Sequence, residues 1–201
     1  MNPIIVIPTY VSGHGQTNSG DVVTVYDHMT PINRQGELAR CLGSLRDHGV
    51  DVPIGIIVVS SRGLEHEAQA KVEDIAKHFH DLEITIVGAE KEDALHDRMV
   101  RMGLGELCDG VSLSGYGALR NMGLVMAAVG GYDMVIFIDD DEVVENDDFL
   151  EKSCYGMGGL TPKGIPILVK SGYYLDKQGE YHARDKAVWY NKYWQRHEGF
   201  N

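Results

Sequence analysis

Short runs of β-branched residues alternate along the chain with longer stretches in which apolar residues recur at helical spacing. Strands are predicted for residues 4–7, 54–59, 83–87 and 134–138. Helices are predicted for residues 36–48, 65–79, 93–102 and 117–129. Because strands and helices alternate, the expected fold is α/β, a Rossmann-like, mainly parallel sheet with helices on both faces.

The pattern loosens towards the C-terminus, where only weak strands are predicted, at residues 165–169 and 173–175. We therefore expect two parts, a core of residues 1–150 and an appended region of residues 151–201. No helix stop signal precedes Asn201, so we expect the chain to be one part of a longer protein.

The charge balance limits the classes of partner. The chain of 201 residues has a formal net charge of −12 at pH 7, and this argues against a nucleic-acid partner, which needs a basic face. A phosphorylated small molecule stays compatible if a metal ion or an arginine offsets the repulsion. The three cysteines show no CxxC spacing, and the apolar start is too short for a signal peptide or a membrane span. We expect a cytoplasmic protein without a transmembrane segment.

Polar residues that can carry chemistry follow three of the predicted strands, at residues 8–10 (PTY), 60–63 (SSRG) and 139–142 (DDDE). Open α/β sheets bind ligands beyond the carboxyl ends of their strands. Side chains alternate along an extended chain, so Asp139 and Asp141 are expected on one side and Asp140 on the other. Two carboxylates at this spacing can bind one hard cation, Mg²⁺ or Mn²⁺. The alternative is a solvated acidic turn without a ligand.

A glycine-rich segment, GYGALRNMG at residues 115–123, leads into a predicted helix. Glycines at a helix start permit close approach of the backbone to a phosphate, and Arg120 adds a positive charge. The alternative is an ordinary connection with Arg120 in water. The same segment, followed by an acid at Asp139, also has some similarity to a dinucleotide-binding fingerprint, but its third glycine is missing.

Five segments in this order resemble those of a family-2-like glycosyltransferase of the GT-A fold, and the match covers roughly residues 4–150. The family typically has V-I-P-T-Y-N, an E-L-L-x-x-C-L-x-S-L helix, I-I-V-V-D-D-G-S, A-R-N-x-G and F-L-D-x-D. The corresponding segments here are IVIPTY (5–10), GELARCLGSL (36–45), IIVVSSRG (56–63), ALRNMGLVMA (118–127) and FIDDDE (137–142).

The resemblance implies roles for individual residues. It places Pro8, Thr9 and Tyr10 along the nucleotide pocket, and Arg120, with Asn121 beside it, near the base or the phosphates. It implies a DxD motif at Asp139 and Asp141, which would hold Mn²⁺ or Mg²⁺ on the diphosphate while Asp139 and Asp140 contact the donor. The chain departs from the family where D-D-G-S is replaced by Ser60, Ser61, Arg62 and Gly63, and in an insertion at residues 11–29.

The predicted function is a metal-dependent transfer of a sugar from a nucleotide-diphosphate donor to an acceptor that the sequence does not identify. The alternatives are a non-catalytic nucleotide-sugar-binding module of the same fold and a dinucleotide-binding protein. An inverting enzyme needs a carboxylate base for the acceptor hydroxyl. The sequence does not select among Asp176, Glu180, Asp185 and Glu198.

Overall fold

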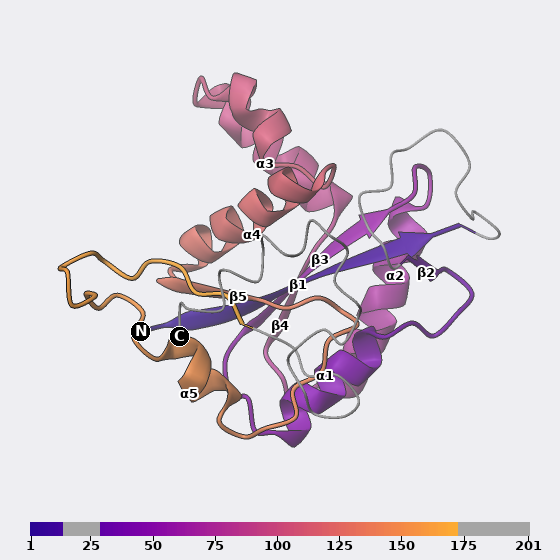
Figure 1. Cartoon of the computed structure of the whole chain (residues 1–201). Helices are drawn as coiled ribbons and strands as arrows, with labels where there is room; N and C mark the ends of the chain where they lie inside the picture. The colour runs from indigo at the N-terminus through magenta and orange to yellow at the C-terminus, as the bar shows by residue number, and fades with distance from the viewer. Residues whose placement is uncertain (14–28, 173–201) are drawn as a thin grey trace, which may run out of the picture. The chain divides into compact units, whose positions relative to one another are not determined.

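A computed structural model of the chain describes residues 1–13 and 29–172. The chain divides into two compact units, Met1–Tyr155 and Gly156–Asn201. The first unit has the predicted α/β architecture, because its strands are all paired in parallel and helices flank the sheet (Figure 1).

The sheet contains five strands, β1 (Pro3–Ser12), β2 (Thr30–Pro31), β3 (Ile54–Ser60), β4 (Ile84–Val87) and β5 (Met134–Phe137). β1 lies in the centre, with β3 and then β4 on one side. The other side of β1 is shared by two strands. β5 pairs with its first half, where Val6 is opposite Phe137, and β2 pairs with its end, where Val11 is opposite Thr30.

The helices of the first unit are α1 (Leu38–Asp47), α2 (Glu65–Ala76), α3 (Ala89–Arg101), α4 (Tyr116–Gly130) and α5 (Phe149–Cys154), with 3₁₀ turns η1 (Lys77–Phe79) and η2 (Gly105–Gly110). α1 and α2 cover one face of the sheet, and α4 covers the other (Figure 1). α1 buries Leu38, Cys41, Leu42 and Leu45, which share one helical face.

α4 packs closely on the sheet because a glycine faces the strands. A Cβ atom at Gly123 would lie 2.7 Å from Cε1 of Phe137 and 3.0 Å from Cγ1 of Val6. Leu119 and Met122, 1% and 2% exposed, extend the same buried face of the helix. This close approach holds the first turns of α4, including Arg120, against the strand ends.

The chain order creates a switch point in the sheet. After the short β2, the chain passes to β3 and β4 on one side of β1, and then returns to place β5 on the other side of β1. In open α/β sheets the crevice beyond the carboxyl ends of such a strand pair is where ligands bind. Here the strand pair is β1 and β5, and β5 ends where Phe137 lies opposite Val6.

Two predictions at element boundaries are wrong. Pro8 does not end the first strand, which continues to Ser12, and residues 165–169 do not form a strand. Gly164, with φ +76°, ends a tight turn, and Pro166 has no N–H to extend a ladder, so only a single bridge to Leu160 forms. The strand predicted at residues 173–175 lies outside the described residues.

Candidate active site at the switch point

Residues 139–142, which follow β5, form a turn, and the extended conformation that we predicted for them is wrong. The N–H of Ile138 donates to the carbonyl of Val6 at 3.2 Å. The next bond of a parallel ladder would run from the N–H of residue 8 to the carbonyl of Ile138, and Pro8 has no N–H. The chain instead turns, and the N–H of Glu142 donates to the carbonyl of Asp139 at 3.1 Å.

Each of the three aspartates in this aspartate turn (residues 139–142) is held by a different element. The contacts are Arg120 Nη2 of α4 to Asp139 Oδ1 at 2.8 Å, Thr9 Oγ1 of β1 to Asp140 Oδ2, and Arg40 Nη2 of α1 to the carbonyl of Asp141 at 2.9 Å. The structure therefore brings together Thr9, Arg120 and the three aspartates, which the sequence had assigned to one site.

The guanidinium of Arg120 is enclosed by aromatic rings, and only one of its terminal nitrogens, Nη2, makes hydrogen bonds to described residues. Its guanidinium carbon lies 4.9 Å from the ring centre of Tyr116 and 4.8 Å from that of Phe137, and Nη2 also donates to the Tyr116 hydroxyl at 2.8 Å. Burial alone would lower the pKa of Arg120, but hydrogen bonds to Tyr116 and Asp139 outweigh it and raise the pKa. Nη1 is buried and, within the described residues, has no hydrogen-bond partner.

Asp140 is the buried member of the aspartate turn, with 9% of its surface exposed. Burial raises its pKa from 3.8 to about 6; the Thr9 hydrogen bond opposes this, and the charges of Asp141 and Asp139 add to it. Glu142 accepts the N–H of Asp139 at 2.9 Å, and its pKa is also raised, mainly by burial. The turn thus concentrates more negative charge than its surroundings neutralise.

Cys41 of α1 is buried next to the aspartate turn. It is 1% exposed, and its Sγ lies 3.9 Å from the carbonyl of Asp139. Burial, followed by the charges of Asp140, Glu142 and Asp141, raises the pKa of this thiol to about 12. Because a thiolate is needed for covalent chemistry, Cys41 is a packing residue.

The other residues that the sequence assigned to substrate binding do not contact the aspartate turn in the described hydrogen bonds. The Tyr10 hydroxyl lies 3.3 Å from Oγ of Ser61, which connects the ends of β1 and β3 beside the site. Ser60 is the last residue of β3, and Arg62 follows it on the exposed surface. Asn121 donates to the carbonyl of Gly110 at 2.8 Å, so its side chain ties α4 to η2.

Sequence reasoning missed three residues of the site, namely Arg40, Tyr116 and Phe137. Tyr116 precedes Arg120 by four residues on one helix, and this spacing is a usable signal for a stacked pair. Arg40 and Phe137 give no comparable signal, because each reaches the site only through the tertiary fold.

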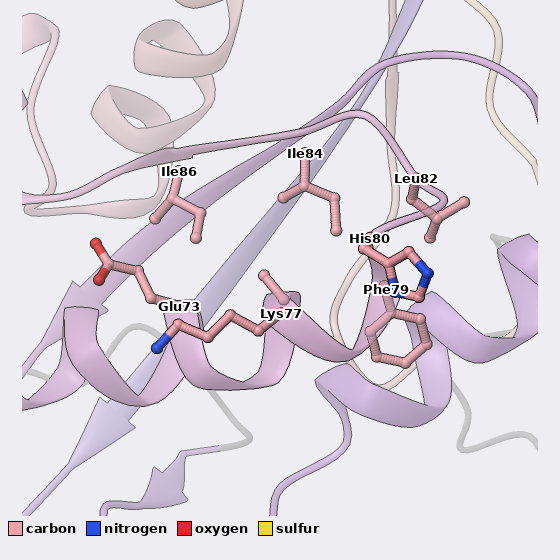
Figure 2. Close-up of a pocket in the computed structure, with 8 residues that line it drawn as sticks. Glu73, Lys77, Phe79, His80, Leu82, Ile84 and Ile86 are labelled. Carbon is pink, nitrogen blue, oxygen red and sulfur yellow. The ribbon is translucent and has the colours of Figure 1, made fainter.

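A separate open depression lies at the opposite edge of the sheet, where the end of α2 meets β4 (Figure 2). Ile84 and Ile86 point into it from β4, with Phe79 and His80 at one end and Glu73 and Lys77 along the helix. It has a mainly apolar lining and no group of carboxylates. The three aspartates and Arg120 lie at the switch point and not in this depression.

No protein-family model matches the chain, and no match is found among curated proteins. Among residues 1–13 and 29–172, none of the helices has the length and apolar character needed to cross a membrane. Over the same residues, no group of three or more His, Cys, Asp or Glu side chains is arranged so that it could hold a metal ion.

Proposed function

We propose that the protein is a metal-dependent glycosyltransferase that takes a sugar from a nucleotide-diphosphate donor, with the donor bound at the switch point. The observation that carries this proposal is the buried Nη1 of Arg120, beside the aspartate turn, which has no acceptor among residues 1–13 and 29–172. A buried donor without a partner is unfavourable by about 1–3 kcal/mol, and more when charged. An oxygen of a diphosphate would supply the acceptor, and the position is where α/β sheets bind nucleotides.

The donor set of the aspartate turn fits a hard divalent cation. Asp139 is half exposed, and Asp141 is partly buried next to it. Mg²⁺ and Mn²⁺ need only one or two protein carboxylates when phosphates and water complete the shell, so a group of three protein ligands is not required. When bound, the metal would supply stabilisation of the negative charge that develops on the leaving nucleoside diphosphate.

The chain's own residues would bind and orient the donor. The stacked guanidinium of Arg120 would hold the diphosphate in one orientation, because Tyr116 and Phe137 leave it little freedom to move. Thr9 would keep Asp140 in its buried position, away from the donor phosphates. Tyr10 and Ser61, joined across β1 and β3, would form the wall near the base.

The four acids from which a catalytic base was predicted (Asp176, Glu180, Asp185, Glu198) lie outside the described residues. A binding module that holds the donor without turnover is the second outcome that the experiment must separate.

The test combines donor binding with donor turnover. Titration calorimetry with UDP and GDP, with and without Mn²⁺, is expected to show metal-dependent binding by the unmodified protein and at least tenfold weaker binding by Asp141→Ala. Glu145→Gln, an exposed acid of the same loop, is the matched control and is expected to bind normally. Release of sugar from UDP- or GDP-sugars identifies an enzyme, and binding without release identifies the module.

Equal nucleotide affinity for the unmodified protein and Asp141→Ala, with and without metal, would contradict the metal site. Affinity for NAD in place of UDP and GDP would support the dinucleotide-binding alternative and overturn the proposal.

A further inference from the structure

Arg40 and Ser44 of α1, and His48 at the C-cap of this helix, contact the acidic segment (residues 139–147) in sequence order. Arg40, Ser44 and His48 follow one another at four-residue spacing, which places them on one side of a helix. Arg40 Nη2 donates to the carbonyl of Asp141 at 2.9 Å. Ser44 Oγ accepts the N–H of Val144 at 3.0 Å, and His48 Nδ1 lies 2.7 Å from Asp147 Oδ1.

The acidic segment (residues 139–147) therefore runs along α1 in the same direction as the helix. Four helical residues advance about 6 Å, and three residues of the segment cover the same distance at each step. Two of the three contacts are made to the backbone of the segment, not to its side chains. Contacts of this kind fix the position of the chain along the helix whatever side chains the segment carries.

Ser44 is the central contact of this set. Its hydroxyl donates to the carbonyl of Cys41 at 2.7 Å, so the oxygen is oriented to accept from Val144. Val144 is 7% exposed, and its N–H would lack water if Ser44 were absent. The His48–Asp147 pair is more exposed, with 29% and 88% of the side chains accessible, and contributes less.

The neighbouring face of α1 anchors the helix in the core through Leu38, Cys41, Leu42 and Leu45. The Arg40–Ser44–His48 face is therefore a rigid support, since the helix cannot shift without disturbing buried packing. The segment that it supports begins with the aspartates that contact Thr9 and Arg120.

We propose that Arg40, Ser44 and His48 are positioning residues that set the place of the acidic segment along α1, and with it the geometry of the aspartate turn. The effect on backbone order does not depend on the proposed function. The effect on metal-dependent nucleotide binding does rest on it.

The first test measures amide hydrogen exchange by mass spectrometry on the metal-free full chain. Ser44→Ala is expected to speed exchange in peptides covering residues 139–147 by about tenfold, because one buried donor loses its partner. Ser44→Thr keeps the hydroxyl and is expected to restore slow exchange. His48→Ala is expected to give about a twofold increase near Asp147. The control is Asp47→Asn on the same helix, whose carboxylate pairs with Arg46 and not with the segment.

The second test titrates UDP and GDP with Mn²⁺. Ser44→Ala is expected to bind about fivefold more weakly, with recovery in Ser44→Thr and no change in Asp47→Asn. If the unmodified protein binds neither nucleotide, the proposed function fails while the exchange result still decides the positioning role. Unchanged exchange in Ser44→Ala, equally faster exchange over the whole chain, or no rescue by Ser44→Thr would overturn the inference.

Discussion

Replacing Arg120 by glutamine is expected to change nucleotide and metal binding in opposite directions. Glutamine removes the positive charge while keeping a side chain of similar reach. Nη2 of Arg120 pairs with Asp139, and Nη1, which has no hydrogen-bond partner in the described part of the chain, would donate to the diphosphate of the proposed donor. In Arg120→Gln, a bound nucleotide diphosphate would lose a charged hydrogen-bond donor, so its binding would weaken. A metal ion bound by Asp139 and Asp141 would no longer compete with the guanidinium cation, so its binding would become tighter.

The size of each change follows from the contacts. Hydrogen bonds to charged groups contribute about 1.5–3 kcal/mol, so Arg120→Gln should weaken nucleotide binding by about 10- to 100-fold. The ion pair with Asp139 is part-exposed, with 53% of the carboxylate side chain accessible. Pairs of this kind contribute about 0.2–1 kcal/mol, so Mn²⁺ alone should bind more tightly, by up to about fivefold.

Free Mn²⁺ is measured by electron paramagnetic resonance without nucleotide, and UDP and GDP binding by calorimetry. The matched control is Arg46→Gln, because Arg46 also stacks on an aromatic ring, at 5.3 Å from the centre of Phe79, but contacts Asp47 and not the aspartate turn. A fall in both affinities would show that Arg120 only supports the fold of the turn. Unchanged nucleotide affinity would remove Arg120 from the donor site.

Two further predictions concern stability. Gly123→Ala is expected to lower the free energy of unfolding in urea by about 1–3 kcal/mol, because the added Cβ meets the Phe137 ring. Gly117→Ala in the same helix has open space around its Cβ and is expected not to lower this free energy. Equal effects of the two substitutions would contradict the packing argument. Because the pKa of Asp140 is raised from 3.8 to about 6, the folded state binds the extra proton between these values, so stability falls as pH rises through that window. In the presence of a chelator, unfolding curves from pH 4 to 7 are expected to show that Asp140→Asn removes this pH-dependent loss of about 2–3 kcal/mol in the free energy of unfolding. The same pH profile in Asp140→Asn and the unmodified protein would refute the assignment to Asp140.

Local sequence patterns predicted much of the fold, because buried strands and helices have their own periodicities. The runs at residues 54–59 and 134–138 and the helix after Gly115 lie where the pattern placed them. That Thr9 and the aspartates lie close together was also accessible from the sequence, since parallel strands bring their carboxyl ends to one edge of the sheet.

The conformation of the site was less accessible. Asp139 to Glu142 read as a strand end, and the turn follows from Pro8, which is remote in sequence and adjacent in space. Asn121 was grouped with Arg120 because the two are neighbours in the motif. In a helix, neighbours point about 100° apart, and Asn121 is directed to Gly110.

The aspartate turn also has a consequence for folding. Its partners lie 131, 101 and 19 positions away in the chain, at Thr9, Arg40 and Arg120. Contacts at such separations form only after long loops have closed, so the turn is assembled late, when β5 docks beside β1. During synthesis, Thr9 and Arg40 emerge long before the aspartates do. Until docking, the aspartates stay hydrated as ordinary coil, and the burial that perturbs Asp140 arises only in the nearly finished domain.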